Sequence, residues 1–300
     1  MLEIIKYNEQ EYPYPCLLVL GCFDALHIGH AELIKKAKLQ AKINGLDLGI
    51  MMFSNGKGGR QIYTLEERLK LLEQFNVKFV LLVDYNENFK KTSPEQFLSN
   101  VESKLNVKGY MSGRDFRFGE GAKAKSSTLK AYAEDDDNGV WYMSVKDITY
   151  VGEKVSTTLI KNCIDAEGNL VKAGALLGRN YSVTGIVVEG ANRGKKVVGF
   201  PTVNMKYPSD KVEVKKGVYK VKCLAGDEEF IGIANYGGRP TFNENSTILE
   251  AHLDGFIGTL YGRAVTVEFI EYLRETQKFE SVDELKAQLK LDLKRARLKV

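Results

Sequence analysis

The feature that most constrains the fold is a change in the hydrophobic pattern part-way along the chain. From residue 17 to about residue 165, short apolar runs alternate with segments of helical periodicity. Parallel strands need crossover helices and are buried on both faces, so this alternation predicts a parallel sheet with helices on both sides. The apolar runs lie at 17–21, 47–53, 78–83, 107–111 and 140–145, and the helical segments at 29–44, 64–75 and 93–105.

After about residue 180, strand-like runs follow one another with only turns rich in Gly, Asn and Asp between them. Strands in quick succession without helices predict an antiparallel barrel. The chain closes with a charged amphipathic helix at 281–299, whose basic end suits a helix C-terminus. The strand-like runs lie at 181–189, 217–224, 228–236, 246–253 and 263–273.

We therefore expect an α/β domain followed by a β domain. The first is a Rossmann-like doubly wound parallel sheet, and the second is an antiparallel β-barrel with a terminal helix. The chain has 300 residues, which is long enough for two domains. The boundary falls between residues 165 and 181, which gives domains at 1–178 and 179–300.

Composition indicates which cellular compartment and which classes of binding partner to expect. The formal net charge of +4 is below the clustered basic excess of a dedicated nucleic-acid binder. No run of eighteen apolar residues and no signal peptide occurs, and the four cysteines form no C-x-x-C pair. We expect a cytoplasmic, reduced protein without nucleic-acid or membrane partners. The sequence carries no signal for an oligomeric state.

Two of the three histidines lie in one short stretch, GCFDALHIGHAELIKKAK (21–38). Gly21 allows a close turn after the strand, and Gly29 allows a phosphate to approach the start of a helix, where unpaired N–H groups attract anions. His27 and His30 are one turn apart and can stabilise charge on a reacting phosphate. Two surface histidines on a capped helix are the plainer interpretation. The position at the carboxyl edge of a parallel sheet favours a ligand site.

Four segments of the first half resemble one known family. GCFDALHIGH (21–30) resembles the H-x-G-H signature of nucleotidyltransferases, and YMSGRDFRFG (110–119) resembles the V-G-x-D-F-x-F-G stretch of bacterial FAD synthetases. VSTTLIK (155–161) resembles their I-S-S-T-x-I-R segment, and ALLGRNY (175–181) the linker to their second module. The chain resembles bifunctional riboflavin kinase/FAD synthetases over nearly its whole length.

The resemblance implies that the first domain transfers AMP from ATP to FMN. The attacking FMN phosphate is ionised at pH 7, so positioning and charge stabilisation are needed rather than a general base. His27 and His30 are the implied catalytic residues, and Asp115 is the implied flavin-binding residue. The residues implied to bind ATP or its phosphates are Gly21, Phe23, Asp24, Gly29, Thr157, Thr158 and Lys161.

The first domain departs from the family pattern at three places. Asp24-Ala25 stands where Asp-Gly is usual, and Lys161 stands where the S-S-T-x-x-R motif ends in arginine. The family's P-H-P stretch is absent, and SNGKGGR (54–60) follows Phe53 instead. Lys57 or Arg60 of this glycine-rich loop can supply replacement cations. A simple surface turn is an equally good interpretation of the loop.

The second half carries the stretch GANRGKKVVGFPTVN (190–204), whose end resembles the G-F-P-T-A-N motif of riboflavin kinases. The resemblance implies that Thr202 and Asn204 bind Mg²⁺, for which neutral oxygen ligands are suitable when phosphates and water complete the shell. A β-turn at Pro201 with polar flanks is the alternative. The residues implied to bind ATP or its phosphates are Gly190, Gly194, Gly199, Phe200, Pro201, Tyr219 and Asn235.

Glu250, within LEAHL (249–253), falls on the position of the family's catalytic base. Riboflavin's terminal alcohol is a poor nucleophile, so a carboxylate that takes its proton is chemically required. Without the resemblance, Glu250 reads as an outward-facing charge. His252 shares a strand face with Glu250, and we favour a packing role for it. Arg274 matches the family's L-R-x-E-x-x-F segment, which implies a place on the flavin side.

We expect a bifunctional enzyme that makes FMN from riboflavin and FAD from FMN, with ATP as co-substrate and Mg²⁺ as cofactor. A riboflavin kinase with a degenerate adenylyltransferase half is the alternative that the missing P-H-P stretch and Lys161 suggest. A tRNA-linked enzyme of the same superfamily predicts a K-M-S-K-S-like loop, which the chain lacks. A non-catalytic flavin-binding protein is the third alternative.

Overall fold

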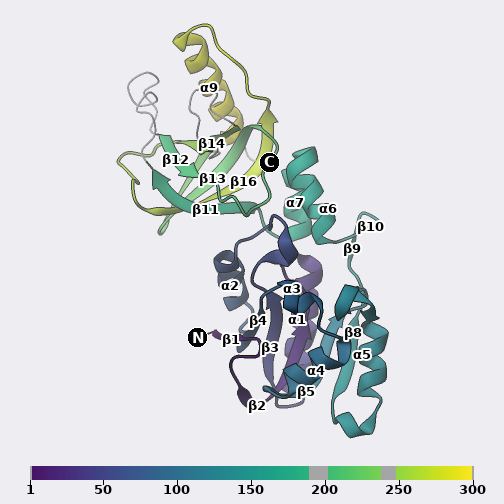
Figure 1. The fold of residues 1–300 in the computed structure, drawn as a ribbon. Coiled ribbons are helices and arrows are strands. Elements are labelled where there is room, and N and C mark those ends of the chain that lie inside the picture. Colours follow the sequence, from purple (N-terminus) through teal and green to yellow (C-terminus); the bar gives the residue numbers. More distant parts are fainter. Residues whose placement is uncertain (1, 189–201, 238–247, 299–300) are drawn as a thin grey trace. The chain divides into compact units, whose positions relative to one another are not determined.

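The computed structural model describes residues 2–188, 202–237 and 248–298, and it divides the chain into two compact units. The first unit spans Met1–Thr157 and the second Thr158–Val300. Figure 1 shows a layered α/β unit and a barrel. The predicted fold class is therefore confirmed in both parts.

A six-stranded parallel sheet forms the first unit, in the order β1-β4-β3-β2-β5-β8. The chain moves from β2 outward through β3 and β4, and then returns to the other side of β2 for β5. The carboxyl end of β2 therefore lies at the switch point of the sheet, where doubly wound folds bind ligands. The strands are β1 (Glu3–Lys6), β2 (Tyr12–Leu20), β3 (Asp47–Phe53), β4 (Phe79–Val83), β5 (Leu105–Gly113) and β8 (Trp141–Val145).

The continuous apolar run of β2 contributes side chains to two separate hydrophobic cores. Leu17 and Val19 pack with the helices α1 (Ile28–Ile43) and α2 (Leu65–Glu73) on one face of the sheet. Leu18 and Leu20 pack on the other face with α4 (Pro94–Glu102) and α5 (Ser126–Ala133). Alternate side chains of a strand point to opposite faces of the sheet. A strand that is buried on both faces therefore needs apolar side chains at successive positions.

Helix starts in this unit follow the predicted capping chemistry. Thr64 and Glu67 form a reciprocal capping box at the start of α2. Ser93 caps α4 with Pro94 in the first turn. The sequence did not predict β1 or α5. It also did not predict two short hairpins, whose two-residue strands carry no measurable alternation. The hairpins are β6 (Arg117–Phe118) with β7 (Ala124–Lys125), and β9 (Thr149–Tyr150) with β10 (Glu153–Lys154).

A closed antiparallel barrel forms the second unit, in the order β11-β12-β15-β14-β13-β16. The sequence predicted five of these strands, but β12 was read only as part of a motif. The helices α6 (Thr157–Asn162) and α7 (Leu170–Leu177) precede the barrel. The strands are β11 (Tyr181–Val188), β12 (Thr202–Lys206), β13 (Gly217–Ala225), β14 (Glu228–Gly237), β15 (Ile248–Leu253) and β16 (Ala264–Arg274).

The predicted terminal helix is α9 (Val282–Arg297), which packs on the outside of the barrel against β13 and β14 (Figure 1). Leu289 and Leu293 of the helix contact Val218 and Ile233 of the strands in one apolar cluster. Ser281 caps the helix, and its last turn is basic, as its sequence predicted. One outer face of the barrel is thus covered by the helix.

Candidate active sites

The first site is built on the loop that follows β2. Phe23 and Leu26 both have positive φ, of 50° and 45°, so the backbone turns tightly before α1 begins. A Cβ atom at Gly21 would lie 2.7 Å from the Phe23 ring, which explains why a glycine is needed there. Asp24 is buried, and its Oδ1 accepts a hydrogen bond of 2.8 Å from the backbone N–H of Ile62.

The histidine pair lies at the start of α1, as predicted. His27 is the N-cap residue, and its Nδ1 accepts a hydrogen bond of 3.2 Å from the backbone N–H of His30. Because Nδ1 is an acceptor, the neutral ring of His27 carries its proton on Nε2. The two imidazoles stack with ring centroids 3.7 Å apart, and Phe23 lies 4.7 Å from the His30 ring. The helix N-terminus thus presents imidazole N–H and backbone N–H groups together, an arrangement suited to a phosphate.

The other predicted residues of this site lie on neighbouring loops. Asp115 follows β5, and its carboxylate pairs with Lys154 of the β9–β10 hairpin at 2.7 Å. Lys154 also pairs with Asp147 at 2.9 Å, so one ammonium bridges the loops after β5 and β8. Burial lowers the pKa of Lys154, but the two carboxylates outweigh it and leave the pKa raised. The ammonium therefore stays charged beside Asp115.

The S-T-T-x-x-K segment enters α6. Thr157 is the first residue of this helix, Thr158 is exposed, and Lys161 lies in the last turn. Just before it, the backbone N–H of Val155 donates to the carbonyl of Ile148 at 2.9 Å. A Cβ atom built on Gly29 would lie 4.0 Å from that of Ile148, so Ile148, whose carbonyl binds Val155, lies close to the start of α1.

Sequence reasoning missed Arg68, which the structure places wholly in the interior. Its guanidinium donates to the carbonyls of Phe53 and Ser54, at 2.6 and 2.9 Å, and to the Gln61 side chain at 2.6 Å. Arg68 thereby holds both ends of the glycine-rich loop that follows β3. The signal was available, because the arginine lies four residues before the buried Leu72 on the apolar face of α2.

The second site is a row of polar side chains on the outer face of the barrel. Glu250 of β15 pairs in register with Asn204 of β12 on one side and with Asn235 of β14 on the other. Directly opposed Cβ atoms in antiparallel strands are about 5 Å apart, so the carboxylate has an amide on each side. One step along the strands, Thr202 is paired with His252. Five polar residues from three strands therefore share one face.

Burial determines the protonation state of the His252 imidazole. Removal from solvent lowers the pKa of its imidazole, and the charge of Glu250 opposes this shift only in part, so His252 is neutral at pH 7. Within the described ranges, the His252 Nδ1 and the Asn235 Oδ1 are buried without a hydrogen-bond partner. Asn204 is only 3% exposed, although it lies on the outer face. Within the described part of the chain, the Asn235 Oδ1 and the His252 Nδ1 are thus left unsatisfied, which is typical of a ligand site.

Tyr219 and Arg274 have structural contacts. Tyr219 is fully buried inside the barrel, where its hydroxyl donates to the carbonyl of Lys215 and its ring packs on Phe269. Arg274 pairs in register with Val218, but its guanidinium binds Asp292 of α9 at 2.7 Å. Their predicted roles at ATP and flavin stay predictions. Gly190, Gly194, Gly199, Phe200 and Pro201 lie outside the described residues.

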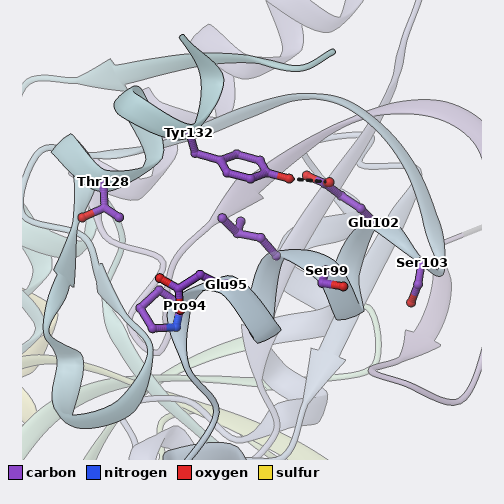
Figure 2. Close-up of a pocket in the computed structure, with 8 residues that line it drawn as sticks. Pro94, Glu95, Ser99, Glu102, Ser103, Thr128 and Tyr132 are labelled. Carbon is purple, nitrogen blue, oxygen red and sulfur yellow. Dashed lines mark hydrogen bonds between the residues drawn. The ribbon is translucent and has the colours of Figure 1, made fainter. Parts of the chain in front are cut away.

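A cavity of about 470 Å³ lies in the first unit, between α4 and α5 (Figure 2). In Figure 2 the Tyr132 hydroxyl donates to Glu102, at 2.7 Å. Tyr110 donates to the same carboxylate at 2.9 Å, so the polar wall of the cavity is a satisfied structural network. None of the residues predicted to act on a substrate lines this cavity.

Comparisons with known proteins cover both units. A family model described as FAD synthetase matches residues 9–159, and one described as riboflavin kinase matches residues 177–300. A protein of Bacillus subtilis named bifunctional riboflavin kinase/FMN adenylyltransferase is 32% identical, over 93% of this chain and 91% of its own length. One of the same name from Haemophilus influenzae is 30% identical over 99% and 98%.

The fold also matches a solved structure. A crystal structure titled macrolide-efflux protein, from Streptococcus pneumoniae, superposes with a TM-score of 0.90 and 27% identity, and the match covers all of both chains. Among the described residues of the present chain, no helix has the length and hydropathy needed to cross a membrane.

Proposed function

The chain belongs to the bifunctional riboflavin kinase/FMN adenylyltransferase family, and on that premise we propose which residues carry out its two reactions. The enzyme phosphorylates riboflavin with ATP to give FMN, and it transfers AMP from ATP to FMN to give FAD and pyrophosphate. Both family domains are present in order, so the alternative of a kinase alone is not favoured.

In the kinase reaction, Glu250 is the general base. Its carboxylate takes the proton of the riboflavin 5′-hydroxyl as that oxygen attacks the γ-phosphorus of ATP, and the bond to ADP breaks. Asn204 and Asn235 lie on either side of Glu250 in the register of the strands, on the same outer face. The supporting observation is this register, which brings three segments far apart in sequence to one spot.

Thr202 and Asn204 are the residues that would hold Mg²⁺. The donor set fits this ion, because both offer neutral, hard oxygen atoms next to an acidic residue. No group of three or more His, Cys, Asp or Glu side chains in the described part of the chain is arranged to bind a metal. Such a site leaves most ligand positions to phosphates and water, where the bound ion neutralises triphosphate charge.

In the adenylyltransferase reaction, a phosphate oxygen of FMN attacks the α-phosphorus of ATP, and pyrophosphate leaves with the bonding electrons. His27 and His30 stabilise the charge on the α-phosphate, because they lie at the N-terminus of α1 with imidazole N–H donors. Gly21, Phe23, Asp24 and Gly29 shape the loop that receives the nucleotide.

The remaining assignments of both sites follow the family resemblance. In the first domain, Thr157, Thr158 and Lys161 bind phosphate, and Asp115 binds the flavin. In the second, Tyr219 and the glycine-rich segment before β12 take part in binding ATP, and Arg274 lies on the flavin side. We place the domain boundary at 178/179. The FAD synthetase match ends at 159 and the riboflavin kinase match begins at 177, whereas the compact units divide earlier, between Thr157 and Thr158. We also propose a cytoplasmic enzyme without nucleic-acid or membrane partners, and the modest net charge of +4 supports the part that concerns nucleic acid.

Replacement of the base tests the kinase assignment. Glu250→Gln keeps the shape of the side chain but cannot accept the proton, so FMN formation should fall at least about a hundredfold. Because FMN adenylylation occurs in the other unit, the variant should still convert added FMN to FAD at the wild-type rate, which shows that it is folded. Flavins are separated by HPLC, and Glu228→Gln, an exposed charge at the start of β14, is the matched control.

The outcome is decisive in either direction. If Glu250→Gln forms FMN within about threefold of the wild type, Glu250 is not the base. If the wild type forms no FMN from riboflavin and Mg-ATP, the kinase proposal itself fails.

A further inference from the structure

The glycine-rich loop after β3 is the one sequence motif to which the proposed reactions give no role. We propose that Lys57 of this loop is an additional phosphate-binding residue of the adenylyltransferase site, where its ammonium contacts the triphosphate of ATP. The inference rests on the proposed adenylyl transfer, and it deepens that assignment by naming a cation that the family motifs do not supply.

The loop lies at the same sheet edge as the histidine pair. β3 and β2 are parallel neighbours, with Leu20 opposite Met51, so the loops that follow them leave the sheet side by side. The hydrogen bond from the Ile62 N–H to Asp24 Oδ1 then ties the far end of the β3 loop to the histidine loop. The two loops form one connected surface.

Arg68 gives this loop a fixed shape. The buried guanidinium binds the carbonyls of Phe53 and Ser54 at the start of the loop and the Gln61 side chain at its end. A buried charge is costly unless it is fully bonded, so this arrangement is unusual for a simple surface turn. The clamp indicates that the loop conformation is needed for something beyond connecting β3 to α2.

Lys57 lies at the tip of the clamped loop in a strained conformation. Its φ of 62° and ψ of 27° are left-handed, a region that is unfavourable for a non-glycine residue. Glycines stand on both sides of it in the sequence, so this chain has a lysine where a glycine would fit without strain. Strain of this kind clusters at ligand-binding sites.

The Lys57 ammonium lies over the aromatic ring at the end of β3. Its Nζ lies 5.3 Å from the centroid of the Phe53 ring, on the last residue of β3. Burial raises the pKa of the Cys22 thiol, and the Lys57 ammonium is the leading influence that opposes this rise. The charge of Lys57 therefore acts on Cys22, in the loop that joins Gly21 to the histidines.

The charge of Lys57 is available to a ligand. Within the described ranges, no carboxylate forms an ion pair with it, whereas Lys154, which lies beside Asp115, is bound by two. When pyrophosphate leaves the α-phosphorus, negative charge builds up on its oxygens, and a positioned cation stabilises it. A lysine meets this need as a point charge without bidentate geometry.

The test uses the intact enzyme and both of its reactions. Lys57→Met keeps the length of the side chain but removes the charge. It should lower kcat/KM for ATP in FAD synthesis by about 30-fold or more. In the reverse reaction it should raise the KM for inorganic pyrophosphate by about tenfold or more, since that ligand is held by the same cation. FMN formation by the barrel should not change.

Two control variants complete the experiment. Lys57→Arg should restore FAD synthesis to within about threefold of the wild type, because it retains the charge. Lys70→Met removes an exposed lysine from α2 and should change neither reaction. If Lys57→Met makes FAD and uses pyrophosphate like the wild type, the assignment of Lys57 is wrong. If the wild type makes FMN but no FAD, the adenylyl-transfer assignment is wrong, and that of Lys57 falls with it.

Discussion

Replacing Asp292 by asparagine should loosen α9 from the barrel and destabilise the riboflavin kinase unit by about 3 kcal/mol. Asp292 is 1% exposed and accepts hydrogen bonds of 3.1, 3.0 and 2.7 Å from the Arg274 guanidinium. Gln288 donates a further bond of 2.9 Å to the same carboxylate. An asparagine at this position would occupy the same space but leave the arginine without a counter-charge.

The magnitude follows from how the two partners are buried. Removing one member of a buried ion pair costs about 3–5 kcal/mol, because the other charge stays buried and uncompensated. The Arg274 side chain is 18% exposed and still donates 3.0 Å to the Glu275 carbonyl, so the lower end of that range applies. For a unit of this size, a loss of about 3 kcal/mol lowers the midpoint of thermal unfolding by about 10 °C.

Scanning calorimetry of the whole enzyme measures this shift. The double variant Arg274→Met with Asp292→Leu should recover most of the loss, because an apolar pair leaves no buried charge. Asp227→Asn, in the exposed β13–β14 turn, is the matched control and should change little. A midpoint for Asp292→Asn within about 2 °C of the wild type would refute the reasoning. So would a double variant as unstable as the single one.

Two further predictions concern the other end of α9 and the histidine loop. Hydrogen bonds from Arg297 lower the pKa of Asp254 against the opposing effect of burial. The stability from this pair is therefore complete above about pH 4 and is lost as the pH falls through the lowered pKa. At about pH 7 the wild type should unfold at a higher temperature than Asp254→Asn, and this difference should disappear at strongly acidic pH. A difference that stays constant with pH would contradict the prediction. Gly29→Ala would put a Cβ atom 3.1 Å from the His27 ring, so FAD synthesis should fall about tenfold with FMN formation unchanged. Equal rates of FAD synthesis in a flavin assay would show that the His27 position is not critical.

The two reaction centres differ in how far local sequence could locate them. The histidine pair and its helix are consecutive in the chain, so glycine spacing, capping and periodicity placed them correctly at the end of β2. Asn204, Asn235 and Glu250 are far apart in sequence, and only the strand register brings them into one row. The family resemblance named them, but no periodicity could have done so.

Several roles depended on partners that no local pattern contains. Arg68 reads as a charge on a helix, yet it is the buried clamp of the β3 loop. Arg274 reads as a ligand residue, yet its guanidinium binds Asp292 on a helix 18 positions away. β12 was not predicted as a strand because its first residues were read only as the end of the G-F-P-T-V-N motif.

The sequence by itself determined the two architectures, the caps of the main helices and the chemistry of the histidine loop. These depend on neighbouring residues, whose hydrogen bonds and periodic burial are set within a few positions of the chain. The tertiary structure decided which amides flank Glu250, which charges are buried and satisfied, and where the Lys57 ammonium points. Those properties depend on contacts between segments that are far apart in sequence. Such contacts form only when the strands of the sheet or the barrel have come together in register.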